Sequence, residues 1–195
     1  MIVLITGPSG AGKSSFIDRL MAADPRLAFS VSTTTRSMRA GEVDGLDYDF
    51  VDDAAFDRLL DENAFVEWAT VHGNRYGTRR RALEAMAAEG RIPLLDIDVQ
   101  GGLQVIPQFG GELVSVFLFP PSWDELERRL RSRGTDSDEA IARRLATARQ
   151  EIAVADRYDW WIVNDDLDIA VRRMQAVIEA APCLRQAWPA PPLDS

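Results

Sequence analysis

The sequence predicts an α/β fold in which helices flank a core of parallel strands. Five apolar runs are too short for helices and mostly lack polar alternation, which is typical of strands buried on both faces. Between them lie segments in which apolar residues recur with helical spacing. Such alternation of strand and helix indicates a parallel sheet covered by helices. The length of 195 residues suits one domain with a substantial core.

The expected elements follow from these patterns. Strands are expected at Ile2–Thr6, Leu27–Ser32, Ile92–Ile97, Leu113–Phe119 and Trp160–Val163. Helices are expected at Ser14–Ala23, Asp52–Glu62, Arg79–Glu89, Trp123–Arg131, Asp138–Ala155 and Leu167–Ala181. The core-facing stripe of the fifth helix consists of Ile141, Leu145, Ala148 and Ile152. Arg143 and Arg144 are expected to point away from that stripe.

Residues 33–78 break the alternation and predict a small, mixed α/β subdomain inserted into the core. Short polar and aromatic runs at Tyr48–Val51 and Phe65–Val71 resemble a partly antiparallel sheet with one helix. The segment Gly134–Glu139 is polar and begins with glycine, as a mobile lid does. We expect one domain, with its core at residues 1–32 and 79–181, a lid at about 133–150 and an irregular tail at 182–195.

The composition excludes several classes of protein. Acidic residues (31) outnumber basic residues (22), and the net charge of -9 argues against a surface for duplex nucleic acid. No apolar run reaches the ~20 residues of a membrane-spanning helix, and the opening MIVLIT is interpreted as a buried strand and not as a secretory signal. The single cysteine, Cys183, permits neither an internal disulfide nor a thiolate metal site. A cytoplasmic protein without membrane or nucleic-acid partners is expected.

The sequence GPSGAGKS, residues 7–14, predicts a phosphate-binding loop. It fits the pattern G-x-x-x-x-G-K-[ST] at every fixed position, directly after an expected strand and before an expected helix. Glycines allow backbone N–H groups to close around phosphate oxygens, and the following helix N-terminus adds positive potential. The pattern therefore predicts binding of ATP or another nucleoside triphosphate. The residues expected at this site are Gly7, Pro8, Ser9, Gly10, Ala11, Gly12, Lys13, Ser14 and Ser15.

Two groups are expected to act on the triphosphate itself. Lys13 is the one lysine among 22 basic residues, which points to a need for a compact ammonium that reaches the β- and γ-phosphates. Ser14 offers its hydroxyl to Mg²⁺, whose shell requires an acidic residue at the end of another strand. Asp96, in LLDID, is the candidate for that metal ligand.

A second anion site is expected in the inserted subdomain. The segment TTTRSMRAGEVDGLDYDF places Arg36 and Arg39 in a glycine-bearing loop with Tyr48. Two guanidinium groups beside a phenol can clamp a monophosphate, although an isolated pair of loop arginines is also compatible with plain solvation. Further polar residues follow in FVEWATVHGNRYGT and LDIDVQG, and each taken singly is ordinary surface: Glu67, Tyr76, Thr78 and Asp98.

Together these motifs resemble the guanylate kinases, P-loop nucleoside monophosphate kinases that pass a phosphoryl group from ATP to GMP. The resemblance covers nearly the whole chain, from Ile2 to about Ala181. Its markers occur in the order GPSGAGKS, FSVSTTTRSMRAGEVDGLDYDF, FVEWATVHGNRYGT, LLDIDVQG, SRGTDS and IVNDDLD. It implies Mg²⁺-dependent phosphorylation of GMP to GDP, with dGMP as a further expected acceptor, and a GMP-binding role for the inserted subdomain.

The resemblance also implies roles for individual residues. The guanine base is read by Ser32, Glu67, Thr78 and Asp98. The acceptor phosphate is held by Arg36, Arg39, Tyr48 and Tyr76. Arg133 and Arg144 belong to the lid on the ATP side, and Asn164 and Asp165 lie near the adenine. The catalytic residues are then Lys13, Arg36, Arg133 and Arg144.

The chemistry of guanine agrees with two acidic readers. Guanine presents its N1–H and exocyclic amino group as donors, which carboxylates at Glu67 and Asp98 can accept. Adenine has a lone pair at N1, so it would leave those carboxylates unpaired, and discrimination of ~10⁴-fold is attainable at such sites. The acceptor phosphate is already anionic, so no general base is required.

Two other functions are compatible with the predicted fold. A guanylate-kinase-like domain can be a non-catalytic protein-binding module, but such a module does not need the phosphate-binding loop. A related kinase acting on a phosphorylated ribose would keep the loop without a guanine pocket, so Glu67 and Asp98 weigh against it. The sequence leaves the oligomeric state open.

Some conspicuous residues have plainer interpretations. Arg79–Arg81 lie where a helix is expected to begin, and we expect them to be solvated and paired with local acids. His72 is not expected to act as a base, because the reaction needs none. Trp160 and Trp161 are expected to pack their strand, and Cys183 to have no role.

Overall fold

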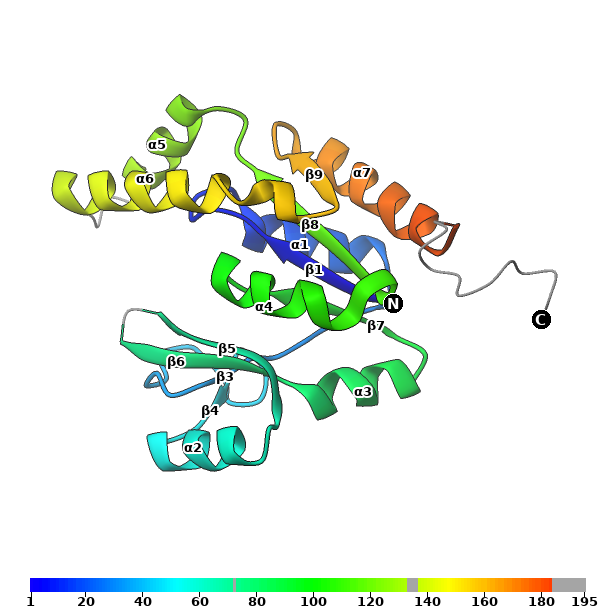
Figure 1. Ribbon diagram of the computed structural model, residues 1–195. Helices are drawn as coiled ribbons and strands as arrows, with labels where there is room; N and C mark the ends of the chain where they lie inside the picture. Colours follow the sequence, from blue (N-terminus) through cyan, green and yellow to red (C-terminus); the bar gives the residue numbers. More distant parts are fainter. Residues whose placement is uncertain (72, 133–136, 184–195) are drawn as a thin grey trace.

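The computed structural model describes residues 1–71, 73–132 and 137–183 and contains two sheets (Figure 1). The larger sheet has the strand order β2-β7-β1-β8-β9, and all of its paired neighbours run parallel. Its strands are β1 (Ile2–Thr6), β2 (Leu27–Phe29), β7 (Ile92–Asp96), β8 (Leu113–Phe119) and β9 (Trp160–Val163). The parallel core sheet expected from the apolar runs is confirmed.

Helices cover both faces of this sheet, as Figure 1 shows. Two of them, α1 and α7, pack together on one face, and α4 lies against the other. In the part of the chain that the structure describes, no helix is both long enough and apolar enough to cross a bilayer. The helices of the core are α1 (Lys13–Ala23), α3 (Arg80–Ala88), α4 (Val99–Phe109), α5 (Trp123–Arg131), α6 (Asp138–Ile152) and α7 (Leu167–Ala180).

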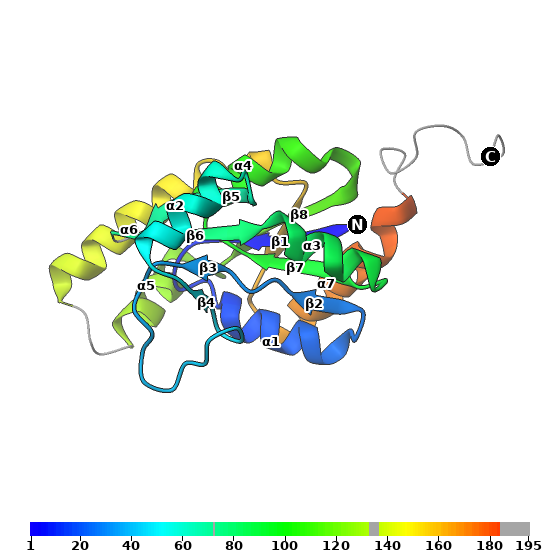
Figure 2. The same cartoon turned by 90° about the horizontal axis from the view of Figure 1, so that it is seen from below.

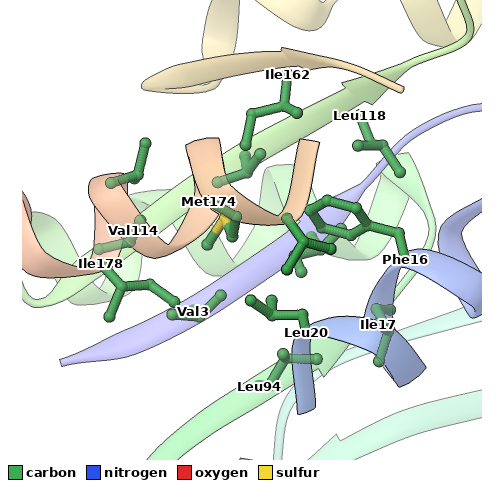
Figure 3. Packing of buried hydrophobic residues seen from close by; sticks show 14 of the residues in the cluster. Val3, Phe16, Ile17, Leu20, Leu94, Val114, Leu118, Ile162, Met174 and Ile178 are labelled. Atoms are coloured by element: carbon green, nitrogen blue, oxygen red, sulfur yellow. The ribbon is translucent and has the colours of Figure 1, made fainter. Parts of the chain in front are cut away.

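Alternation along β1 divides the hydrophobic core into two layers. Val3 belongs to the layer under α1 and α7, whereas Leu4 belongs to the layer under α4, because successive strand residues point to opposite faces. Figure 3 shows the first layer, to which Phe16 of α1 and Met174 of α7 both contribute. All four of these side chains are fully buried, so the end of β1 and the start of α1 rest on a rigid base.

Several expected bounds need correction. The strand from Leu27 ends at Phe29 and not at Ser32, and the helix from Asp138 ends at Ile152 and not at Ala155. The sequence did not predict α4, because two glycines and Pro107 in VQGGLQVIPQF are poor helix formers. It forms because Asp98 caps its first turn and its apolar side chains reach the second core layer.

The second sheet is formed within residues 33–79 and has the order β4-β3-β6-β5. Its strands β3 and β4 are parallel, whereas its other neighbours are antiparallel, as expected for a mixed sheet. One helix packs on it through Phe56, whose ring lies 4.7 Å from that of Phe65. These elements are β3 (Thr33–Thr34), β4 (Asp49–Phe50), α2 (Asp53–Asp61), β5 (Phe65–Val71) and β6 (Asn74–Arg79).

Helix α4 joins the two sheets. Strand β5 is an edge strand, so its backbone groups need partners from outside the sheet. Gln104 donates a hydrogen bond of 3.0 Å to the carbonyl oxygen of Trp68, and Gln108, one turn later, donates one of 2.6 Å to that of Val66. In Figure 1, α4 accordingly lies between β5 and the core sheet, and Figure 2 shows it beside β5. The start of α4 is thereby held between the two sheets.

Candidate functional site

The loop between β1 and α1 has the geometry of an anion-binding cradle. Gly7 and Gly12 have φ values of 155° and 89°, which L side chains rarely adopt, and a Cβ at Gly7 would collide with the carbonyl oxygen of Leu118. Helix α1 begins with no capping side chain and no acidic residue in its first turn. By contrast, α2, α4, α5, α6 and α7 each begin with an Asp or Ser cap. The first N–H groups of α1 are therefore left for an anion.

The expected cation and metal ligands lie at this loop. Lys13 Nζ donates a hydrogen bond of 3.0 Å to the carbonyl oxygen of Gly7, which holds the ammonium over the cradle. Asp96 ends β7 in register with Ile5 of β1, and Ser14 lies in the first turn of α1. Burial raises the pKa of Asp96, and the nearby Lys13 charge opposes that rise. Among the described residues there is no cluster of three or more His, Cys, Asp or Glu that could hold a metal ion by itself.

Two side chains hold the loop from behind. Asn164, buried at the end of β9, donates a hydrogen bond of 2.9 Å from Nδ2 to the carbonyl oxygen of Ala11. Arg129 of α5 donates to the same oxygen at 3.2 Å and is itself held by Glu125 at 2.7 Å. Sequence reasoning missed Arg129, because no local pattern reveals a contact across 118 residues. The amide of Asn164 supports the loop, so its contact here is with the protein backbone.

A cavity of about 910 Å³ extends from the cradle toward the second sheet. This volume is within the usual range for small-molecule sites. Residues from the loop and α1, from the end of β5, from the start of α4 and from α6 surround it. Its lining comprises Gly7, Pro8, Ser9, Gly10, Gly12, Lys13, Ser14, Ser15, Thr70, Val71, Asp98, Gln100, Ala140, Arg143, Arg144, Thr147 and Glu151. The cavity thus brings the expected donor residues together with Asp98.

One face of α6 forms the wall opposite the loop. Arg143, Thr147 and Glu151 recur at intervals of four, so they share this face, and Arg144 lines the cavity beside them. That spacing was a signal in the sequence for Thr147 and Glu151, which were not among the expected site residues. Burial raises the pKa of Glu151, while the charge of Lys13 lowers it. Arg133, the other expected lid arginine, lies outside the described residues.

The expected base-reading residues gather where β5, β6 and α4 meet. Glu67 is 5% exposed, and its Oε1 accepts a hydrogen bond of 2.5 Å from the Thr78 hydroxyl. Burial raises the pKa of Glu67 to about 7, the Thr78 bond opposes this, and the charge of Asp98 adds a smaller rise. Asp98 Oδ1 caps α4 by accepting from the Gly101 N–H at 2.8 Å. The structure therefore brings Glu67, Thr78 and Asp98 together, with Asp98 lining the cavity and with Glu67 and Thr78 outside its lining.

The expected phosphate clamp is partly assembled. The Arg36 guanidinium lies 5.1 Å from the ring centre of Tyr48, and the rings of Tyr48 and Tyr76 meet edge to face at 5.9 Å. Arg36 also pairs with Glu42 through two hydrogen bonds, of 2.7 and 3.0 Å. The Arg39 side chain is exposed and forms no hydrogen bond or ion pair with any described residue. The structure thus unites Arg36, Tyr48 and Tyr76 and leaves the Arg39 side chain apart.

The remaining expected residues take less central positions. Ser32 is half-buried beside β3, and its carbonyl oxygen accepts from the Asp49 N–H at 2.9 Å. Asp165 is exposed and pairs with Arg173 at 3.3 Å. His72 lies outside the described residues.

The residues with plainer interpretations are also on the surface or in packing roles. Arg79 pairs with Asp49 at 2.5 Å, as expected for a cation with a local acid. Trp161 packs on Phe119 at 5.3 Å, yet it remains 61% exposed because β9 is an edge strand. Cys183 is an exposed free thiol.

Comparisons with known proteins agree with this geometry. The family model described as guanylate kinase matches residues 1–181. A guanylate kinase of Nitratidesulfovibrio vulgaris is 52% identical over 176 residues, covering 90% of this chain and 84% of the relative. One of Zymomonas mobilis is 47% identical over 178 residues, covering 91% and 82%. A solved guanylate kinase structure from Anaplasma phagocytophilum superposes with a TM-score of 0.76 at 34% identity, covering 95% of this chain and 87% of that one.

Proposed function

Because this chain belongs to the guanylate kinase family, we propose that its site transfers the γ-phosphoryl group of ATP to GMP. The observation that carries the proposal is a cavity that joins the glycine-rich loop and Lys13 to Asp98, which lies near the buried Glu67 and Thr78. One end of this cavity suits a triphosphate and the other suits a guanine base. Two nucleotides bound at these ends would meet phosphate to phosphate.

On the donor side, the uncapped start of α1 and the loop N–H groups bind the triphosphate of ATP. Lys13 releases the Gly7 carbonyl oxygen and moves its ammonium to the β- and γ-phosphates. Arg143 and Arg144, on the opposite wall, add positive charge from α6. The adenine is expected near Asn164 and Asp165, and the Asn164 amide keeps the loop backbone in its phosphate-binding shape.

On the acceptor side, Glu67 and Asp98 accept hydrogen bonds from the guanine N1–H and amino group. The burial that makes Glu67 costly to ionise also makes it selective, because a base without those donors leaves a buried carboxylate unpaired. Thr78 holds one oxygen of Glu67 and so fixes the direction in which the other can accept. GMP, and by the same contacts dGMP, is therefore preferred over AMP.

The reaction requires alignment and charge neutralisation more than proton transfer. An oxygen of the GMP phosphate attacks the γ-phosphorus of ATP, and the bond from that phosphorus to the β–γ bridging oxygen breaks, which yields GDP and ADP. Arg36, Tyr48 and Tyr76 orient the attacking phosphate, and Lys13 stabilises charge on the transferred group. No residue needs to act as a base.

Mg²⁺ fits the oxygen donors at the loop. The Ser14 hydroxyl and the Asp96 carboxylate are hard ligands that would hold it together with phosphate oxygens and water. When bound, the ion supplies neutralisation of the triphosphate charge. The cytoplasmic location expected from the composition stays a prediction.

The decisive experiment measures ADP formation with GMP, AMP and a ribose phosphate as separate acceptors. We expect turnover with GMP at least ~10³-fold more efficient than with AMP, because the acidic pair rejects adenine. Activity with the ribose phosphate alone would select a sugar-phosphate kinase instead. Binding of GMP without turnover would indicate a non-catalytic module.

A further inference from the structure

Glu42 is an acidic residue in the loop that carries the expected phosphate clamp. Its side chain is only 19% exposed, and that of Arg36, its partner, is 11% exposed. A carboxylate is unexpected beside residues proposed to bind an anion, because its negative charge offsets their positive charge. Neither the expected site residues nor the cavity lining includes it.

The carboxylate is fixed by its own turn. Glu42 donates its N–H to the carbonyl oxygen of Arg39 at 3.2 Å, and its Oε2 accepts the N–H of Arg39 at 2.7 Å. These two bonds close a ring between residues 39 and 42. Hydrogen bonding to Arg36, and then to the Arg39 N–H, lowers the pKa of Glu42, so the side chain is ionised at neutral pH. Glu42 therefore links the backbone at Arg39 to the guanidinium of Arg36.

The same carboxylate determines which N–H groups of Arg36 remain available. Both of its oxygens accept from Arg36, one from Nη1 and one from Nη2, and Nη1 also donates to the Ser37 carbonyl oxygen at 2.8 Å. A guanidinium has five N–H groups in a fixed plane, and three of those of Arg36 donate to Glu42 and Ser37. Hydrogen bonding to Glu42, with a smaller contribution from the Tyr76 hydroxyl, raises the pKa of Arg36. The Arg36 guanidinium thus has the Tyr76 phenol close by.

Aromatic rings restrict the guanidinium further. Its central carbon lies 5.1 Å from the ring centre of Tyr48 and 5.6 Å from that of Phe50. Arg36 is therefore oriented before any ligand arrives, and the loss of side-chain freedom does not have to occur on binding. The exposed Arg39 side chain keeps a charge with no ion-pair partner among the described residues.

We propose that Glu42 is a positioning residue for the acceptor phosphate, which orders Arg36 and the Arg39 backbone into one preformed clamp beside Tyr76. This role rests on the proposed function, because the phosphate is that of GMP. In the opposite role, Glu42 competes with the phosphate for Arg36, and its carboxylate must leave Arg36 before the phosphate binds. The two roles predict changes of opposite sign when the carboxylate is neutralised.

The test is Glu42→Gln, with steady-state kinetics for both substrates and titration with GMP and with guanosine. We expect the KM for GMP to rise about tenfold, since preorganisation of one clamp is lost, with kcat and the KM for ATP nearly unchanged. Guanosine has no phosphate, so its affinity is expected to stay the same. Parallel loss of guanosine and GMP affinity would mean a purely structural role. A lower KM for GMP would show that Glu42 competes with the phosphate for Arg36.

Two comparisons complete the experiment. Glu179→Gln removes another arginine-paired carboxylate, in α7 far from the loop, and is expected to leave the KM for GMP unchanged. In an Arg36→Ala background, Glu42→Gln is expected to raise the KM for GMP little further, because Glu42 acts through Arg36. A further rise as large as in the wild-type background would overturn the proposal. If the wild-type protein does not phosphorylate GMP at all, the proposed function fails and this role fails with it.

Discussion

The hydroxyl of Thr78 donates a hydrogen bond of 2.5 Å to Oε1 of Glu67, a carboxyl group that is 5% exposed. One neutral donor does not replace the water that an ionised carboxylate loses on burial, so the pKa of Glu67 rises to about 7. The ionisation of this side chain is therefore coupled both to folding and to ligand binding near neutral pH.

Glu67→Gln is expected to stabilise the ligand-free protein more at pH 8 than at pH 5. An acid whose pKa rises on folding contributes stability that is present below its unfolded pKa of 4.5 and is lost as the pH rises through about 7. The difference in free energy of unfolding between variant and wild type should therefore grow by about 2 to 3 kcal/mol between these pH values. Urea denaturation at both pH values measures it, and an equal difference at both would contradict the burial argument.

The affinity for guanosine is expected to increase with pH. If the pKa of Glu67 is about 7, its ionised fraction rises from about a tenth at pH 6 to about nine-tenths at pH 8, so affinity should rise about tenfold. Guanosine is the better probe because it has no phosphate that titrates. Calorimetric titration should lose this dependence in Glu67→Gln, and a retained dependence would assign it to another group. The same variant should impair GMP use far more than ATP binding.

Lys13→Ala is expected to reduce kcat by ~10²–10³-fold while the fold remains intact. The substitution removes the ammonium group that stabilises the negative charge on the transferred phosphoryl group. Among the described residues its side chain makes one hydrogen bond, to the Gly7 carbonyl oxygen, so little stability depends on it. Lys13→Arg retains the charge but presents a broad planar group, and it should also be impaired. ADP formation and circular dichroism measure the two effects, and near-normal turnover would refute the phosphate contact.

Asn164→Ala is expected to destabilise the protein by about 0.5 to 1.5 kcal/mol, because the Ala11 carbonyl oxygen loses one of its two donors and keeps the one from Arg129. The KM for ATP should rise as the loop loses its shape. Asn164→Asp has nearly the same size but places an oxygen against that carbonyl oxygen, so it should destabilise the protein more than Asn164→Ala does. Thermal unfolding and ATP kinetics test both variants. An unchanged KM for ATP would show that Asn164 does not maintain the conformation of the loop.

The effect of Gly101→Ala on the free energy of unfolding should depend on whether Glu67 is present. Alanine in a helix is normally more stable than glycine by up to about 1 kcal/mol. Here a Cβ would lie 2.5 Å from Oε2 of Glu67, so the substitution should destabilise the wild-type protein and displace Glu67. In Glu67→Ala the contact with the carboxylate is gone and the flexible end of Ile97, 3.3 Å from the added Cβ, is the close neighbour that remains, so Gly101→Ala should destabilise far less there. Equal effects in both backgrounds would show that the two residues do not interact.

The elements predicted well were those whose own sequence settles their conformation. The runs at β8 and β9 and the strongly patterned α5 have the bounds expected from periodicity. Helix α4 was missed because its glycines are explained only by distant neighbours, Glu67 beside Gly101 and Tyr158 beside Gly102. Local preference therefore failed where close packing required the absence of a side chain.

The site shows the same division. GPSGAGKS identified the phosphate-binding loop because its glycines, lysine and helix start are contiguous, and the ordered motifs identified the family. Arg129 behind the loop, Glu42 beside Arg36, and the buried Glu67 could not be derived from spacing. Arg129 reaches Ala11 across 118 residues, and the Arg36–Glu42 pair, although local, depends on how the loop turns.

By itself, then, the sequence determined the alternation of strand and helix, the anion-binding loop and the candidate acids for a base. Only the tertiary structure decided which of these groups share a cavity, which are paired with one another, and how far burial shifts the ionisation of Glu67. The physical reason is that backbone preference and hydrophobic periodicity act over a few residues. Desolvation, ion pairing and close packing instead depend on atoms that the fold brings together from distant parts of the chain.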